Sequence, residues 1–205
     1  DKMQENPDAV LFYCNSSVVD KEGKQVGHTD TYFHEVWRES RWDDDFTSIG
    51  VAELAGYQCR GQTVPNMSSA LISTKAFRQA YNPILKRFKL TGDWIFIGQL
   101  MRHGQVVYCK RTLSNFRKHE NTARVRVKSG RSQAEFMLTK YLLFRETGKP
   151  LRGLATTMAS DVIRFLHEPA KWYDVVKIMF KISPKASLRF GIVFLASLLM
   201  NGFLL

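Results

Sequence analysis

A carboxylate at the start of a predicted helix is the group in this chain that is best placed to do chemistry. After Asp93, the residues Trp94, Ile97 and Met101 recur at helical spacing. The positive end of a helix dipole favours an ionised carboxylate, which can act as a general base and take the proton of a hydroxyl group. Asp is also a preferred cap residue. The residues alone therefore leave two roles open for Asp93, general base and helix cap.

A histidine and two cations form a second group, at 117–119. A neutral imidazole such as that of His119 can ligate Mn²⁺, and Arg117 can neutralise a phosphate. The alternative is a basic surface turn, because further arginines and lysines follow. The other histidines have no partner at ligand spacing, and the three cysteines form no CxxC pair. The acidic run Asp43–Asp45 is typical of a solvated loop rather than of a metal site.

The elements that would position these groups alternate between strand and helix. In order, the pattern predicts a strand at 9–14, a polar and aromatic surface excursion at 28–50, a helix capped by Ser73 or Thr74, an amphipathic helix from Asp93 with Gly104 as its C-terminal glycine, and a strand at 106–109. Such an alternation is typical of an α/β domain.

Beyond about residue 130, helical periodicity replaces this alternation. Helices are predicted at 132–145, 154–167, 170–181 and 188–205, separated by segments that contain proline. We therefore expect an α/β domain at 1–130 and an all-helical, basic tail at 131–205.

Four segments of the chain form an ordered set. They are NPDAVLFYCN (6–15), NMSSALI (66–72), LTGDW with the helix that follows it (90–104), and LSNFRKHENT (113–122). At these spacings they resemble the C-terminal half of the catalytic domain of the family 2 glycosyltransferases, which has a GT-A-type mixed sheet with flanking helices. The resemblance covers roughly residues 1–125 and leaves the helical tail outside it.

The resemblance implies an inverting transfer of a sugar from a nucleotide-sugar donor to a saccharide or lipid-linked acceptor, as in the assembly of cell-surface polysaccharides and glycolipids. It implies that Asp93 is the general base. It also places His119, as a metal ligand, and Arg117 near the donor diphosphate and its divalent cation, Mn²⁺ or Mg²⁺.

By the same analogy, the acceptor side of the site would be lined by Asn66, Ser68, Ser69 and Trp94. The alternatives are a turn between strand and helix for the first three, and a core position for Trp94.

The chain also departs from the family pattern. A complete member begins with a nucleotide-binding half that ends in an Asp-x-Asp motif, and neither that half nor a Gly-rich phosphate loop precedes Asn6. We therefore expect the chain to be a fragment of a glycosyltransferase that is inactive on its own, since a leaving diphosphate needs charge stabilisation. The competing hypothesis is a non-catalytic, membrane-associated interaction module or a degenerate remnant.

The formal net charge is +11. Apolar residues make up 44% of the chain and charged residues 24%, a composition that excludes a disordered polymer and a multi-span transporter. Residues 190–205 are apolar apart from Ser197 and Asn201, and a basic segment precedes them. A helix of this length reaches about 24 Å, short of the ~30 Å hydrocarbon core. The sequence thus favours a peripheral position on an anionic membrane surface at the cytoplasmic face, ahead of a packed core helix. No nucleic-acid motif is found, so no nucleic-acid partner is expected.

Overall fold

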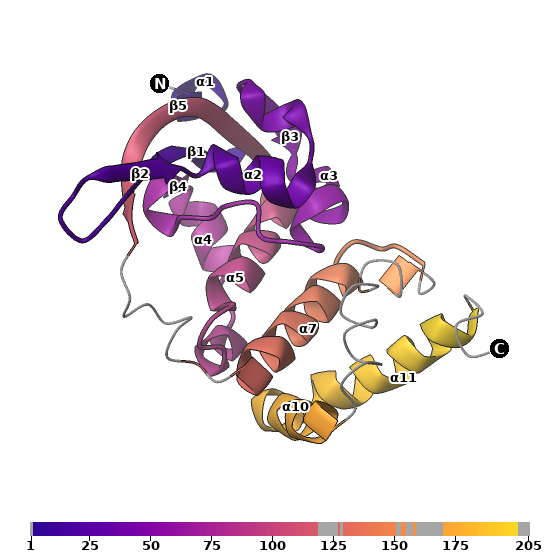
Figure 1. Ribbon diagram of the computed structural model, residues 1–205. Helices are drawn as coiled ribbons and strands as arrows, with labels where there is room; N and C mark the ends of the chain where they lie inside the picture. The colour runs from indigo at the N-terminus through magenta and orange to yellow at the C-terminus, as the bar shows by residue number, and fades with distance from the viewer. Residues whose placement is uncertain are drawn as a thin grey trace.

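The computed structural model describes residues 2–118, 127, 129–150, 153, 154, 158 and 170–200. The first part of the chain forms a mixed, curled β-sheet with flanking helices, and three longer helices lie beyond it (Figure 1). The α/β class expected from the sequence is confirmed.

Five strands form the sheet: β1 (Ala9–Val19), β2 (Gln25–His28), β3 (Phe46–Ile49), β4 (Ala70–Ile72) and β5 (Gln105–Arg117). Their order is β2-β1-β5-β3, and β4 pairs with the first half of β1. The strands β1 and β5 run parallel, whereas the other pairs are antiparallel. Register shifts beside Asn15 interrupt the parallel ladder. Such bulges increase strand twist, in keeping with the strong curl of β5 in Figure 1.

The two faces of the sheet are covered unequally. Alternate residues of a strand point to opposite faces. The residues that face the main core are Leu11, Tyr13, Val106 and Tyr108. The residues on the other face form a smaller cluster of Ala9, Phe12, Cys14, Val107 and Cys109, against which the partly buried Met3 of α1 (Lys2–Glu5) packs. This second face, which we call the open face, is therefore thinly covered by the described residues.

The helices between the strands are short. The α-helices are α2 (Asp30–Trp37), α3 (Gly50–Glu53), α4 (Thr74–Ala80) and α5 (Gly92–Leu100); the 3-10 turns are η1 (Ser40–Asp43), η3 (Met67–Ser69), η4 (Pro83–Arg87) and η5 (Met101–His103); and η2 (Leu54–Gln58) is a π-helical turn. The predicted cap of α4 is confirmed, since the Ser73 hydroxyl accepts the N–H of Ala76 at 3.5 Å.

The helix expected from Asp93 onwards is confirmed as α5, but it is buried almost all round, so its expected amphipathic character is wrong. Every residue from Trp94 to Gly98 is buried, as is Leu100. The reason is its central position, with the sheet on one side and α7 (Ser129–Arg145) on the other. A Cβ at Gly98 would lie 2.4 Å from the Leu143 side chain of α7, which shows how closely the two helices approach.

Gly104 follows the helical segment, but it does not act as a left-handed C-terminal residue. Its φ of 167° is extended backbone, and a Cβ there would lie 2.4 Å from the carbonyl oxygen of Asp8. Glycine is therefore needed at this position because the start of β1 approaches closely, not because of its conformational freedom.

The prediction that residues 28–50 form an excursion on the surface is also wrong. This segment forms α2, η1, β3 and the start of α3, and its Phe33 and Trp42 are each 1% exposed. Their rings stack at 4.6 Å, and Nε1 of Trp42 donates to the hydroxyl of Tyr13 at 2.9 Å. The segment folds back over the sheet, so its aromatic residues complete the main core.

Three long helices form a second hydrophobic cluster. They are α7, α10 (Ala170–Ile182) and α11 (Pro184–Met200). In that cluster, Phe190 and Phe194 of α11 pack with residues of α7 and α10. Most of the helix predicted at 154–167 lies outside the described residues. In the part of the chain that the structure describes, no helix combines the length and the hydropathy that crossing a membrane requires.

Candidate active site

Asp93 lies in the first turn of α5 but does not occupy the cap position. Thr91 does, so Asp93 is the second residue of the helix. Its Oδ1 accepts a hydrogen bond from the backbone N–H of Trp94 at 2.7 Å, and its Oδ2 accepts one from Nε2 of Gln62 at 3.2 Å. The carboxylate therefore serves its own helix and also meets a side chain from a distant loop.

A buried pair of hydrogen bonds fixes that loop, residues 58–63, to the start of α5. Nε1 of Trp94 donates to the carbonyl of Gln58 at 2.6 Å, and Nε2 of Gln58 donates to the carbonyl of Trp94 at 3.0 Å. Oε1 of Gln58 accepts both the N–H and the hydroxyl of Thr63. The loop begins at the π-helical turn η2, and such turns are frequent at functional sites. Gln62 is thereby held beside Asp93.

A second buried group fixes the segment just before α5. The carboxylate of Glu135, on α7, accepts the backbone N–H groups of Lys89, Leu90 and Thr91 at 2.7–3.3 Å. Nε of Arg131 donates to the same carboxylate at 2.7 Å. Sequence reasoning missed Glu135, since its backbone partners lie 44–46 residues earlier. The four-residue spacing of Arg131 and Glu135 is the local signal that could have pointed to a pair.

A cavity of about 270 Å³ opens beside the start of α5. Its walls are Tyr32, Arg60, Gly61, Gln62, Trp94, Phe136 and Lys140. Three of these side chains are aromatic and two are cationic. The volume lies just below the ~300–1,000 Å³ of typical ligand pockets, so the cavity suits a small ligand such as one sugar ring. Trp94, predicted for the acceptor side, lines this cavity, and Gln62 connects it to Asp93.

The other predicted acceptor residues lie at a different place. They build the turn before β4: Oδ1 of Asn66 accepts the N–H of Ser68 at 3.1 Å, and the hydroxyl of Ser69 donates to the carbonyl of Asn66 at 2.6 Å. Nδ2 of Asn66 also donates to the hydroxyl of Ser16 at 3.3 Å. These bonds fulfil the turn role that the sequence left open, and an acceptor role for these residues stays a prediction.

The predicted donor-side residues are not brought to the cavity by any described contact. Arg117 ends β5, is exposed, and its Nη1 donates to the carbonyl of Lys21 at 2.8 Å, in the turn after β1. His119 lies outside the described residues. Their role near a donor diphosphate stays a prediction.

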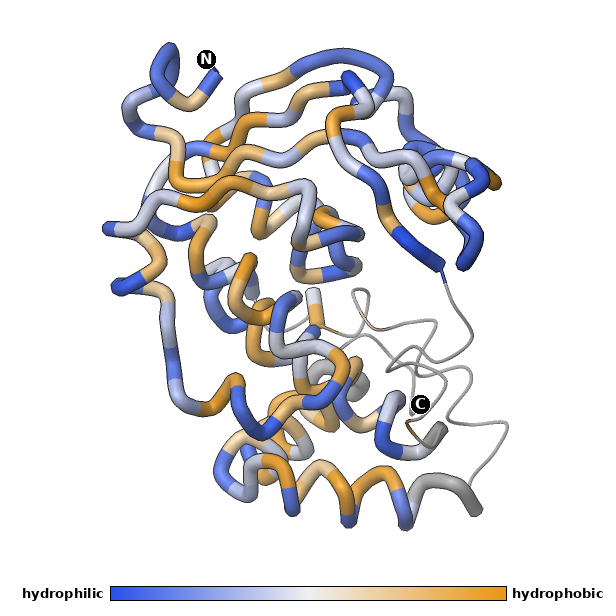
Figure 2. The backbone as a smooth tube through the Cα atoms, turned by 90° about the vertical axis from the view of Figure 1, so that its left-hand side faces the viewer, coloured by the Kyte–Doolittle hydropathy of each residue, from blue (hydrophilic) through white to orange (hydrophobic). Residues whose placement is uncertain are grey.

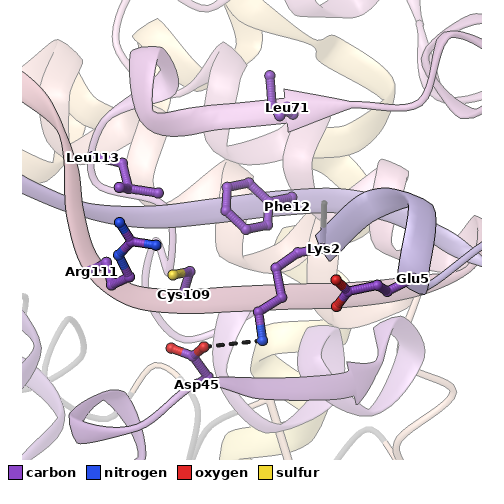
Figure 3. A pocket seen from close by; sticks show the side chains of 8 residues that line it. All are labelled: Lys2, Glu5, Phe12, Asp45, Leu71, Cys109, Arg111 and Leu113. Carbon is purple, nitrogen blue, oxygen red and sulfur yellow. Dashed lines mark ion pairs between the residues drawn. The ribbon is translucent and has the colours of Figure 1, made fainter.

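A larger hollow, of about 500 Å³, lies on the open face of the sheet (Figure 3). Its walls are Lys2, Glu5, Phe12, Asp45, Leu71, Cys109, Arg111 and Leu113. It contains no residue that the sequence predicted for the site, and Leu71 and Leu113 are more than half exposed there. We therefore take the smaller cavity as the candidate active site.

The acidic run Asp43–Asp45 is used in ion pairs. Asp44 pairs with Nζ of Lys110 at 2.8 Å, and Asp45 pairs with Nζ of Lys2 at 3.2 Å (Figure 3). Among the described residues, no three His, Cys, Asp or Glu side chains are grouped so that they could hold a metal ion. The divalent cation that the resemblance implies, with His119 as a ligand, stays a prediction, since His119 lies outside the described residues.

We expect Asp45 to make the protein sensitive to acid. The backbone N–H of Lys110 and, after it, the Lys2 ammonium lower the pKa of Asp45 from its usual 3.8. Its contribution to stability is therefore present above that value and is lost as the pH falls through the lowered pKa. In Asp45→Asn, the free energy of unfolding should change less between pH 5 and pH 2, as measured by urea unfolding. An unchanged pH slope would contradict this assignment, and Asp174→Asn on α10 is the control.

We compared the chain with protein-family models, curated proteins and solved structures, and no match was found in any of the three.

Proposed function

We propose that the chain supplies the acceptor-binding half of an inverting, GT-A-type glycosyltransferase, with Asp93 as its general base. The observation that carries the proposal is the hydrogen bond between Asp93 and Gln62, since Gln62 is also a wall of the cavity. The carboxylate is thus one side chain away from a hollow with aromatic and cationic walls. The resemblance of the four ordered segments to family 2 glycosyltransferases supports the same role for Asp93.

The proposed reaction needs one base and one leaving group. An acceptor hydroxyl in the cavity attacks the anomeric carbon of the donor sugar, and a carboxylate oxygen of Asp93 takes its proton. The new carbon–oxygen bond forms as the bond to the diphosphate breaks on the opposite face, and the electron pair leaves with the nucleoside diphosphate. Attack from the opposite face inverts the configuration of the anomeric carbon. Asp93 lies in the first turn of α5, where the positive end of the helix dipole favours a negatively charged side chain.

The walls of the cavity fit a saccharide that carries a negative charge. The aromatic residues Tyr32, Trp94 and Phe136 give the cavity an apolar part of its wall, against which a sugar ring can pack. Arg60 and Lys140 add two cationic groups at the same cavity, and such groups bind phosphate or carboxylate. A lipid-linked saccharide, whose lipid is attached through phosphate, combines both features.

The donor-binding half is proposed to cover the open face. The open face is the one that the described helices leave thinly covered, since they pack mainly against the other face. Among the described strands, β4 has β1 as its one neighbour, which leaves its other edge available for a further strand.

A transfer assay tests the proposal. Nucleotide sugars, Mn²⁺ and a pool of lipid-linked saccharides are offered to the chain alone and to the same chain joined behind a nucleotide-sugar-binding half. We expect no turnover by the chain alone, and transfer with inversion by the joined protein. Robust turnover by the chain alone would contradict the division into two halves, and a retained configuration would contradict a single base.

A further inference from the structure

Helices α10 and α11 carry six of the fifteen large hydrophobic side chains that are exposed among the described residues. Helices α10 and α11 lie at the end of the protein away from the sheet (Figure 1). Figure 2 shows hydrophobic and hydrophilic residues alternating along the tube there. Their inward sides are accounted for, since Val175 and Met179 of α10 and Phe190 and Phe194 of α11 are buried in the second cluster. The apolar segment that begins at Phe190 is therefore partly a core element, which was the alternative to a position on a membrane surface.

The opposite sides of both helices are apolar as well. Six large apolar side chains on them are between 41% and 74% exposed: Tyr173, Val176, Phe180, Leu188, Ile192 and Leu195. At about 100° per residue, those of α10 lie within about 60° of one another, and so do those of α11. Each helix thus carries one apolar stripe toward its neighbours and a second stripe toward solvent. Among the described residues, the six side chains of these outer stripes belong to none of the hydrophobic clusters.

Four cations flank these outer stripes. Lys177 and Lys181 are exposed beside the stripe of α10, and Lys185 and Arg189 are exposed beside the stripe of α11. By helical geometry all four lie about 50–110° to one side of the stripe centre. Among the described residues none of them is ion-paired with a carboxylate. The one acidic side chain on the outer side of these helices is Asp174.

We propose that this outer face, defined by the six apolar side chains and the four cations, binds the surface of an anionic lipid bilayer. Exposed apolar side chains flanked by Lys and Arg are the pattern of helices that lie in the membrane interface. The apolar groups enter the region between headgroups and acyl chains, while the long cationic side chains reach the lipid phosphates. The surface is a pair of convex helices rather than a groove, which suits a deformable bilayer. A nucleic acid would use the cations but leave the six apolar groups in water.

The test is co-sedimentation with vesicles of phosphatidylcholine alone or mixed with phosphatidylglycerol, using the whole chain. Truncation is unsuitable, because removing residues from Phe190 onwards would also remove part of the core. Instead, Phe180→Glu/Ile192→Glu removes two exposed apolar groups, and Lys181→Ala/Lys185→Ala removes two exposed cations. Val26→Glu/Val51→Glu is the matched control, since both valines are more than half exposed on other elements. Circular dichroism checks that each variant is folded.

We expect the unaltered chain to bind the anionic vesicles and to bind neutral vesicles at least tenfold more weakly. The apolar variant should lose at least tenfold in affinity for both kinds of vesicle. The cation variant should lose affinity for anionic vesicles by about fivefold per cation, and the control should bind as the unaltered chain does. Absence of binding to anionic vesicles, or an equal loss in the control, would overturn the proposal. So would a dimer, seen by light scattering, that the apolar variant alone abolishes, because the face would then be a protein interface. None of these outcomes depends on Asp93.

Discussion

Replacement of Asp93 by Asn should lower the rate of sugar transfer by a factor of ~10²–10⁴, the range typical for loss of a general base. Asn keeps the shape of the side chain and an oxygen that can accept the N–H of Trp94, but it cannot take a proton at neutral pH. The measurement is the initial rate of transfer by the protein joined to a donor-binding half.

The stability of the same variant separates the two roles that the sequence left open. Thr91, not Asp93, occupies the cap position of α5, so Asp93→Asn should lose little more than the favourable interaction of its charge with the helix dipole, about 0.3–1 kcal/mol. Lost transfer with nearly unchanged urea unfolding supports the base. Retained transfer with a clearly lowered free energy of unfolding would mean that Asp93 serves the helix alone.

Two further variants sharpen this test. Asp8→Asn removes an exposed carboxylate in the turn before β1 and should leave transfer unchanged. Gln62→Ala removes the donor that orients Oδ2 of Asp93 and should reduce transfer by about tenfold, less than the loss of the base itself. If Gln62→Ala lowered the rate of transfer as much as Asp93→Asn does, the cause would be a disturbance of the whole loop 58–63.

Features that depend on neighbouring residues could be predicted from the sequence, whereas features that depend on distant residues could not. Helix α5 gives an example of each. Its start near Asp93 was predicted, because a short polar signal before an apolar run is encoded within a few residues. Its burial on nearly all sides was not, because that depends on α7, which begins almost thirty residues after α5 ends. The strand β5 is a similar case. Its apolar first half was predicted, whereas its polar second half is a strand because β1 runs beside it as far as Val19.

The candidate site shows the same division. Asp93 was singled out because it opens a helix, and Trp94 because of the resemblance to family 2 glycosyltransferases. The structure brings Trp94 to the wall of a cavity. Gln62, Gln58 and Glu135 were missed, since each is defined by partners 31–46 residues away. The aromatic residues of α2 and η1 were wrongly expected at the surface. Their sequence neighbours are polar, and their contacts are with the sheet, whose residues are distant in the sequence.

Replacement of Glu135 by Ala should destabilise the protein more than any other single change considered for this site. The carboxylate is 0% exposed and is the acceptor for three backbone N–H groups and for Arg131. Its removal leaves these donors without their acceptor, the buried N–H of Thr91 among them, and leaves a partly buried guanidinium without its counter-charge. Losses of this kind lower the free energy of unfolding by about 3–5 kcal/mol. Urea unfolding followed by circular dichroism measures the loss.

Two comparisons show whether burial is the cause. Glu146→Ala breaks an ion pair with Arg102 whose side chains are 30% and 47% exposed, so it should cost no more than about 1 kcal/mol. Glu135→Gln keeps one oxygen acceptor for the backbone N–H groups and should fall between the two. A Glu135→Ala protein that unfolds at the same urea concentration as the unaltered chain would mean that water replaces the carboxylate without cost. In that event the segment before α5 would not be held by α7, and Asp93 would need another means of being positioned.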